Sequence, residues 1–251
     1  MSFLELLKSL NFNLSFAEVM GYGYFGYNFR LEGQVNIPML IVSAVICAIL
    51  SYLVGSINCS VMISSKKYGK DIRNQGSGNA GATNMLRVYG KKAAVLTFLG
   101  DVLKSALASI IGRLILGYVG AYLAGLFCVI GHAYPIFFKF KGGKGVVAIS
   151  TMCLLTEPLV FLIMLVIFVI ILFGYKMVSL ASIMVMLTYP LVLSQAAMTA
   201  EPVGAHFVLA LFNAFFVVFL HRKNIIRIYN HEESKISFGK KKEKKSYSDE
   251  E

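Results

Sequence analysis

Long apolar runs, separated by short polar stretches, dominate the chain between about residues 36 and 220. A helix needs about 20 residues to cross the roughly 30 Å hydrocarbon core of a bilayer. The runs are long enough for this, and they predict an all-α integral membrane protein with one helical bundle. The clearest predicted spans cover about residues 36–63, 93–112, 113–130, 177–193 and 204–220.

The apolar stretch over residues 146–175 is interrupted by Glu157-Pro158. Proline lacks the N–H that a helix interior needs, and it disfavours helical backbone in the residue before it. The pair therefore predicts a turn at the outer surface between two helices, of which the first is short. This division brings the total to about seven transmembrane helices.

Charge predicts the orientation of these helices. The loop over residues 64–92 carries seven lysines and arginines against one aspartate, and loops rich in these residues stay cytoplasmic. With seven spans the N-terminus is outside, and the basic loops and the C-terminus after His221 are cytoplasmic. Fusing residues 146–175 into one span would put either the early basic loops or the basic C-terminus outside.

The composition agrees with a bilayer protein, since 57% of the residues are hydrophobic and the mean hydropathy is +0.70. The net charge of +11 does not indicate nucleic acid, because the basic residues stand in short stretches beside apolar runs. The four cysteines show no CxxC spacing, which favours packing roles. No set of His, Cys, Asp and Glu has metal-ligand spacing, so we expect neither a metal nor a cofactor.

The chain divides into three parts by composition. Residues 1–35 hold apolar and aromatic residues without a basic start or a cleavage site, which predicts an interfacial extension and no cleaved signal peptide. Residues 36–233 form the seven-helix membrane domain. Residues 234–251 are charged and lack an apolar pattern, which predicts a disordered cytoplasmic tail suited to contact with anionic lipid.

The first candidate site is a glycine-rich stretch within the basic loop. Gly76, Gly78 and Gly81 allow positive φ, so that successive N–H groups can converge on an anion. Short donors and a planar guanidinium follow at Ser77, Asn79, Thr83, Asn84 and Arg87. The alternative is a flexible cytoplasmic turn, because glycine and asparagine are ordinary loop residues.

A second loop, immediately before an apolar helix, also combines glycines with basic residues. Gly142, Gly143 and Gly145 surround Lys144, and a helix N-terminus favours an anion through its dipole and free N–H groups. A purely topological anchor would need only the lysines and leaves the glycines unexplained. Two such loops on one side of the membrane therefore favour phosphate-bearing substrates.

Further candidates lie within or at the ends of the spans. Asp101 and Lys104 share a helix face, as a self-satisfied pair or as the wall of a substrate pocket. His221 and Asn224 lie one helical turn apart, and His221 is a candidate general base or phosphate donor. As an isolated residue it would be interfacial, and His132 is equally ambiguous.

These motifs occur in a recognisable order: DIRNQGSGNAGATNMLR at 71–87, DVLK at 101–104, GHAYPIFFKFKGGKG at 131–145 and HRKNIIR at 221–227. The order closely resembles the bacterial acyl-phosphate-dependent glycerol-3-phosphate acyltransferases, from about residue 55 to residue 233. The resemblance implies a seven-span enzyme of the bacterial plasma membrane with a cytoplasmic active site. It implies acyl transfer from acyl phosphate to glycerol 3-phosphate, giving lysophosphatidic acid and phosphate, as the first acylation of phospholipid synthesis.

The resemblance also implies roles for individual residues. The catalytic group comprises Ser77, Arg87, Lys144, His221 and Asn224. The acyl-phosphate cradle comprises Gly76, Ser77, Gly78, Asn79, Gly81, Thr83 and Asn84. The glycerol 3-phosphate cradle comprises Arg87, Lys104, Gly142, Gly143, Lys144, Gly145 and His221, with Asp101 and Glu233 as structural residues.

The chain departs from the family pattern at a few positions, none of which removes a charged or nucleophilic group. These are Asn58, Ser105, Val147, Ala148 and His231. The implied partners are acyl phosphate, glycerol 3-phosphate, membrane lipid and the soluble enzyme that makes acyl phosphate.

The expected mechanism is direct attack, because acyl phosphate is an activated mixed anhydride and the loops lack a cysteine nucleophile. The acceptor of the hydroxyl proton is either His221 or a phosphate oxygen of a substrate. A transporter of organic phosphates and a non-catalytic membrane scaffold are the alternatives from other classes.

Overall fold

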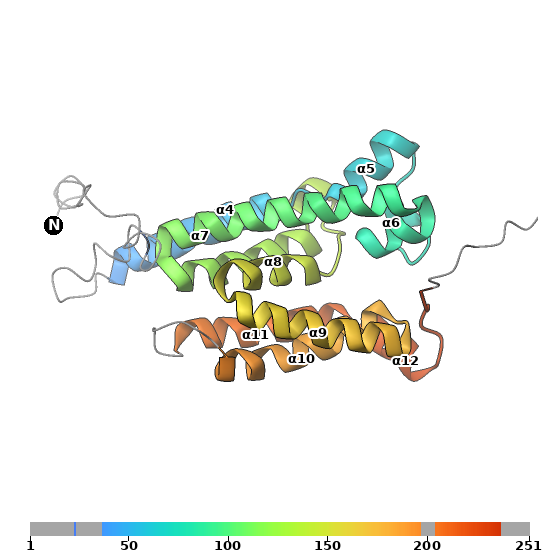
Figure 1. The fold of residues 1–251 in the computed structure, drawn as a ribbon. Helices are drawn as coiled ribbons and strands as arrows, with labels where there is room; N and C mark the ends of the chain where they lie inside the picture. The colour runs from blue at the N-terminus through green and yellow to red at the C-terminus, as the bar shows by residue number, and fades with distance from the viewer. Residues whose placement is uncertain (1–22, 24–36, 197–203, 237–251) are drawn as a thin grey trace, which may run out of the picture.

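The computed structural model describes residue 23 and residues 37–196 and 204–236, and the secondary structure of these residues is helical (Figure 1). The elements are α4 (Ile37–Gly55), α5 (Cys59–Tyr68), η1 (Ile72–Asn74), α6 (Ala82–Tyr89), α7 (Lys91–Ala133), η2 (Ile136–Phe138), α8 (Val146–Thr156), α9 (Pro158–Tyr175), α10 (Val178–Ala196), α11 (Ala205–Leu220) and α12 (Arg222–Tyr229). Three predicted segments lie mostly or wholly outside the described residues. They are the N-terminal extension apart from Gly23, most of the tail, and the turn at Glu201-Pro202 that the sequence predicts between the last two spans.

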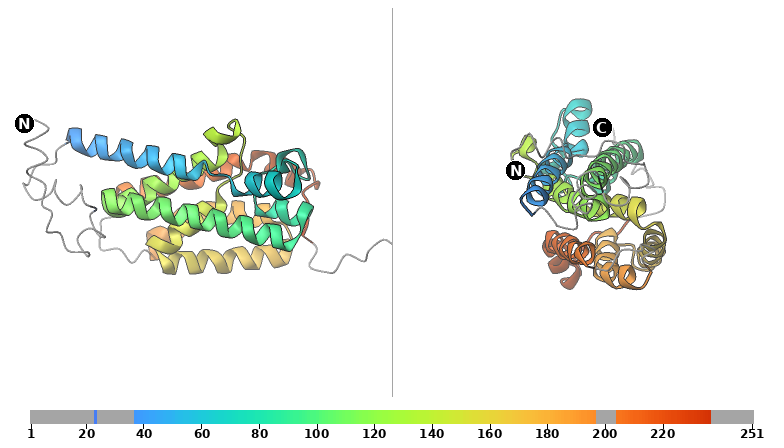
Figure 2. Two further views of the ribbon diagram at one scale, coloured as in Figure 1. Left: turned by 90° about the horizontal axis from the view of Figure 1, so that it is seen from above. Right: turned by 90° about the vertical axis from the view of Figure 1, so that its left-hand side faces the viewer.

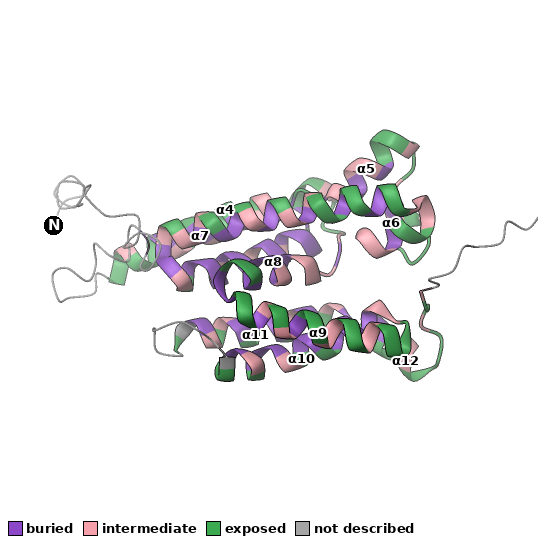
Figure 3. Ribbon diagram, in the orientation of Figure 1, coloured by how far each residue is buried: buried purple, intermediate pink, exposed green. Residues whose placement is uncertain are grey.

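Four segments of the described chain are long and apolar enough to cross a membrane. They are Ile37–Tyr68, Lys91–Phe138, Pro158–Tyr175 and Val178–Gln195. The pair α11 and α12, bent by 55°, brings the number to five if it counts as one span. Many residues of α4 and α9 are exposed (Figure 3), and these include large apolar residues, as expected for surfaces that face lipid. The prediction of an all-helical integral membrane protein is confirmed.

The first predicted span is broken. α4 ends at Gly55, and α5 begins at Cys59 after Asn58, whose Oδ1 accepts hydrogen bonds from Val61 N at 3.1 Å and Ser60 Oγ at 2.7 Å. A Cβ at Gly55 would meet the backbone of Cys128, so glycine lets α4 and α7 approach closely. The break leaves the carbonyl of Ile57 outside the helical hydrogen-bond ladder.

α7 contains the second and third predicted spans and folds back on itself (Figure 1). Leu116 and Gly117 have non-helical backbone, and Gly117 has φ of 62°. The sequence placed the boundary at residues 112–113, about one turn too early. Gly112 and Gly120 face each other across the hairpin, and a Cβ on either would collide with the carbonyl of the other.

The predicted break at Glu157-Pro158 is confirmed. α8 ends at Thr156, and Pro158 is the first residue of α9, where its missing N–H costs no helical hydrogen bond. Glu157 is only 1% exposed, so the turn is packed into the bundle. With 11 residues, α8 is shorter than a full membrane crossing.

Two layers of helices form the bundle (Figure 2), with α4, α7 and α8 in one and α9, α10 and α11 in the other. One apolar core joins the layers, with Tyr122 and Met152 on one side and Tyr189 and Val217 on the other. A second, smaller core at one end contains Val61, Ile72, Ala80, Met85 and Ala93. This small core anchors the first glycine-rich loop to the bundle.

Candidate active site

A cavity of about 1470 Å³ opens at the end of the bundle where α6 and α12 lie. Its wall joins three segments that are distant in the sequence, around residues 71–87, 139–148 and 220–227. The predicted site residues all line it: Gly76, Ser77, Gly78, Asn79, Gly81, Thr83, Asn84, Arg87, Asp101, Lys104, Gly142, Gly143, Lys144, Gly145, His221, Asn224 and Glu233. The fold thus brings the predicted residues to one place.

Asn84 braces the first loop from inside. Its Oδ1 accepts a hydrogen bond from Ser77 N at 2.9 Å, and its Nδ2 donates to the carbonyls of Gln75 at 2.9 Å and Ile72 at 3.3 Å. The side chain is 1% exposed, and a Cβ at Gly76 would collide with its Oδ1. Asn84 therefore shapes the loop from behind, and its side-chain hydrogen bonds go to the loop backbone.

The loop amides differ from the predicted anion nest. Ser77 N donates to Asn84, Gly78 N donates to Gln75 O at 3.0 Å, and Gly81 N donates to Asn79 O at 3.1 Å. The positive φ of Gly76 and Gly78 folds the loop onto itself, so that these three amides are engaged within it. The hydroxyls of Ser77 and Thr83 remain as candidate anion donors on the cavity wall.

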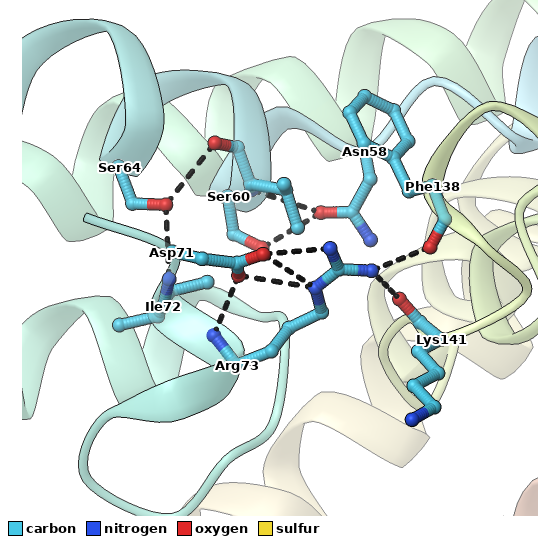
Figure 4. Close-up of polar contacts among 9 residues, drawn as sticks. Asn58, Ser60, Ser64, Asp71, Ile72, Arg73, Phe138 and Lys141 are labelled. Carbon is cyan, nitrogen blue, oxygen red and sulfur yellow. Dashed lines mark hydrogen bonds and ion pairs between the residues drawn. The ribbon is translucent and has the colours of Figure 1, made fainter. Parts of the chain in front are cut away.

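Arg73 joins the first glycine-rich loop to the second (Figure 4). Its guanidinium forms an ion pair with Asp71 at 2.6 Å and donates to the carbonyls of Phe138 and Lys141. This ion pair holds the pKa of the Asp71 carboxyl below its usual value. The clamp fixes the distance between the two loops that carry the predicted cradles.

Gly142 and Gly143 wrap around His132, near the end of α7. Gly143 N donates to His132 O at 3.0 Å. A Cβ at Gly142 would collide with that carbonyl, and one at Gly143 would collide with His132 Nε2. The adjacent glycines are therefore required by their contact with this histidine, which lines the cavity and is 6% exposed.

Asp101 and Lys104 form a buried ion pair at 2.8 Å. Lys104 Nζ also lies 2.8 Å from His132 Nδ1 and donates to Ile57 O at 2.7 Å. The ammonium thus hydrogen-bonds to Ile57 O and His132 Nδ1 and lies at ion-pair distance from the Asp101 carboxylate. The pair thus holds together α7, the break after α4 and the glycine loop beside His132.

Lys144 meets α12 across the cavity. Its Nζ donates to Asn224 Oδ1, and Asn224 Nδ2 donates to Glu233 Oε1 at 3.0 Å. Glu233 also accepts from Arg227 Nε and Ser179 Oγ, which together with Asn224 hold the pKa of its carboxyl below the usual value. Burial lowers the pKa of Lys144 to about 8.

His221 lies at the bend between α11 and α12. Its Nδ1 is 2.8 Å from Val217 O, and a carbonyl only accepts, so the proton sits on Nδ1. Nε2 therefore carries the lone pair. Burial, followed by the nearby positive charge of Lys144, lowers the pKa of His221 to about 4, which keeps the ring neutral near pH 7.

Sequence reasoning missed two members of the site. Arg73 stood in the first motif but was counted only as loop charge, although an Arg two residues after an Asp is a signal for a local ion pair. Ser179, on α10, carries no local signal, since its contact with Glu233 spans 54 residues of sequence. His132 was noted, but its bond to Lys104 spans 28 residues.

The comparisons with known proteins give this cavity a context. The family model described as glycerol-3-phosphate acyltransferase matches residues 45–231, which include every predicted site residue except Glu233. The chain belongs to the glycerol-3-phosphate acyltransferase family. It is an acyltransferase of the membrane that acts on glycerol 3-phosphate, an activity of phospholipid biosynthesis, and the resemblance found in the sequence is confirmed.

Individual relatives of this acyltransferase are similar over nearly their whole length. A glycerol-3-phosphate acyltransferase of Thermoanaerobacter sp. (strain X514) is 42% identical over 193 residues, covering 77% of this chain and 96% of the relative. One from Clostridioides difficile (strain 630) is 39% identical over 211 residues, covering 82% and 100%.

A solved structure extends the likeness to the fold. The crystal structure of PlsY (YgiH), an integral membrane glycerol 3-phosphate acyltransferase in its glycerol 3-phosphate form, matches with a TM-score of 0.71 and 36% identity. The match covers 78% of this chain and 96% of that one. The structure of the same protein in the lysophosphatidic acid form matches with a TM-score of 0.69.

Proposed function

We propose that this acyltransferase takes its acyl group from acyl phosphate and releases lysophosphatidic acid and inorganic phosphate. The observation that carries this proposal is one cavity lined by both basic, glycine-rich loops and by apolar side chains of α7 and α9. Nine lysine and arginine side chains and three carboxylates line the cavity. This excess of positive charge suits two phosphate-bearing substrates. Phe98, Phe168 and Leu172 on its wall suit the acyl chain.

Arg87 and Lys144 hold the two anions together in this mechanism. Their positive charges offset the repulsion between the substrate phosphates and stabilise the oxyanion and the leaving phosphate. The hydroxyls of Ser77 and Thr83, on the braced first loop, bind the acyl phosphate. The loop from Gly142 to Gly145 binds glycerol 3-phosphate. No acyl-enzyme forms.

His221 accepts the hydroxyl proton. Its Nδ1 donates to Val217 O, so the lone pair on Nε2 is the one able to take a proton. The glycerol hydroxyl oxygen attacks the acyl carbon, and its proton passes to Nε2. The bond from the acyl carbon to the phosphate oxygen then breaks, and phosphate leaves with the electron pair. Asn224 and Glu233 keep Lys144 and α12 in position.

The topology proposed with this mechanism has seven crossings, the N-terminus outside and the cavity at the cytoplasmic face of the bacterial plasma membrane. The reversal inside α7 and the break at Glu157 support the additional crossings beyond the apolar segments counted by length. Residues 36–233 form the acyltransferase domain. A cytoplasmic cavity allows the soluble enzyme that makes acyl phosphate to supply the donor directly.

The test of the donor uses purified protein in vesicles. Acyl phosphate and glycerol 3-phosphate should give lysophosphatidic acid and one phosphate for each acyl group transferred, whereas acyl-coenzyme A should give none. Turnover with the thioester alone would contradict the proposed donor. In sealed vesicles without a donor, flux of labelled glycerol 3-phosphate would support a transporter instead.

A further inference from the structure

His132 has a fixed tautomer, which follows from its neighbours. Its Nδ1 lies 2.8 Å from Lys104 Nζ, and an ammonium group only donates hydrogen bonds. Nδ1 therefore carries the lone pair, and the ring proton sits on Nε2. The carboxylate of Asp101 is 3.7 Å from Nδ1, too far for a hydrogen bond that would reverse this assignment.

The Nε2–H group faces the cavity beside the glycine loop. The side chain of His132 is 7% exposed, and Nε2 lies against Gly143, where a Cβ would collide with it. Within the part of the chain that the structure describes, no hydrogen-bond acceptor is found for Nε2. An N–H on the wall of a substrate cavity that has no protein partner is available to donate to a ligand.

Lys104, in contrast, is engaged with protein atoms through two hydrogen bonds and one ion pair. Asp101 Oδ1, His132 Nδ1 and Ile57 O lie 2.7–2.8 Å from its Nζ, and its side chain is 4% exposed. The resemblance placed Lys104 in the glycerol 3-phosphate cradle. In this structure Lys104 also lies on the cavity wall, but the contacts found for its Nζ are to protein atoms.

We infer that His132 donates a hydrogen bond from Nε2 to the phosphate of glycerol 3-phosphate, and that Lys104 acts as the positioning residue that sets its tautomer. This inference rests on the proposed function, since it uses the loop from Gly142 to Gly145 as the glycerol 3-phosphate cradle. The cavity then has two neutral histidines of opposite tautomer. His132 offers a proton for hydrogen bonding at Nε2, and His221 offers a lone pair there.

Two substitutions of His132 distinguish its proposed hydrogen bond to the phosphate from its contact with Lys104. In His132→Gln, the amide nitrogen can replace Nε2 as a donor to the phosphate. In His132→Asn, the shorter side chain can accept from Lys104 in place of Nδ1 but cannot reach the Nε2 position. His231→Asn is the matched control, because His231 is exposed, lies off the cavity wall and has a φ of 59°, which asparagine tolerates.

Equilibrium binding of glycerol 3-phosphate alone, by calorimetry on detergent-purified protein, is the readout. His132→Asn should weaken binding about 10- to 100-fold, His132→Gln by less than about fivefold, and the control by nothing measurable. If His132→Asn bound glycerol 3-phosphate tightly and His132→Gln bound it weakly, the role of His132 would be only to hold Lys104 in position. Because no acyl donor is present, these outcomes do not depend on whether acyl phosphate is the donor.

The tautomer of His132 can also be measured directly in the wild-type protein, so this test does not depend on whether the variants fold. Nitrogen-15 NMR of the wild-type protein in nanodiscs should show His132 with a protonated Nε2 and a bare Nδ1, and the Nε2 signal should shift when glycerol 3-phosphate is added. A protonated Nδ1, or a signal unmoved by saturating glycerol 3-phosphate, would overturn the inference.

Discussion

Lys144 and Asn224 are joined by a hydrogen bond from Nζ to Oδ1, although 80 residues separate them in the sequence. Asn224 uses its Nδ2 at the same time to donate to Glu233 at 3.0 Å. The amide is thereby oriented at both ends, with its oxygen toward a cation and its nitrogen toward a carboxylate. The glycine loop and α12 are fixed relative to each other by this one side chain.

Asn224→Asp should therefore be severely impaired although it is nearly isosteric. Aspartate cannot donate to Glu233, and it would place two carboxylates in contact. We expect kcat to fall at least about 100-fold and the protein to be less stable by about 1–3 kcal/mol, the cost of a lost buried hydrogen bond. The matched control is Asn230→Asp, an exposed position after α12, and activity and thermal unfolding are measured for both.

Activity should decline at alkaline pH because Lys144 loses its charge there. Its pKa is about 8, so it is cationic below that pH and becomes neutral as the pH rises through it. The value of kcat/KM for glycerol 3-phosphate, which reports the free enzyme, should fall tenfold per pH unit above the midpoint.

Lys144→Arg separates this cause from others. Arginine stays charged at every accessible pH, so the alkaline decline should move upward by more than one pH unit in any variant that retains activity. An unchanged alkaline limb in Lys144→Arg would assign the decline to another group.

Removal of the Arg73 side chain should lower kcat/KM for both substrates. Arg73→Ala loses the ion pair with Asp71 and the bonds to the carbonyls of Phe138 and Lys141. We expect kcat/KM to fall about 10- to 100-fold for acyl phosphate and for glycerol 3-phosphate alike. Arg73→Lys should recover little, because an ammonium lacks the planar fork that reaches both loops. Lys67→Ala, an exposed cation on α5, should behave as wild type.

Gly143→Ala should inactivate the enzyme without unfolding the bundle. The added methyl group would collide with His132 Nε2 and Ala80 O, so the glycine loop must move away from the histidine. Gly174→Ala, in α9, has open space around it and should be neutral or slightly stabilising. Activity and thermal unfolding of the two variants test whether the enzyme needs the close contact between Gly143 and His132. Equal activity of the two variants would contradict this requirement.

Hydropathy predicted the helix boundaries well where a helix-breaking residue marks the end of a helix. Pro158 marks its turn because the ring cannot sit inside a helix. The break between α4 and α5 has weaker marks, namely Gly55-Ser56 and the N-cap Asn58, and the predicted span continued through them to residue 63. The predicted boundary at residues 112–113 was also inexact, because Arg113 stays helical with its guanidinium 4.2 Å from the centre of the Tyr118 ring and the chain reverses at Leu116 and Gly117.

Residue types predicted which loops line the cavity, but they could not show which groups of those loops are free to donate to a ligand. Glycine permits several backbone paths, so the engagement of Ser77 N by Asn84 could not be read from the sequence. The same holds for Gly143, which was expected to approach a phosphate and also makes room for His132. Both outcomes depend on side chains 7 and 11 residues away that only the folded chain brings into contact.

The Arg73 clamp has a consequence for how the protein is made. Its acceptors, Phe138 and Lys141, follow Arg73 by 65 and 68 residues, with the whole of α7 in between. During synthesis the first loop emerges long before these carbonyls do, and they can reach it only after the α7 hairpin has formed. The catalytic end must therefore assemble late in biogenesis, and a defect in hairpin insertion would yield an integrated chain without a working site.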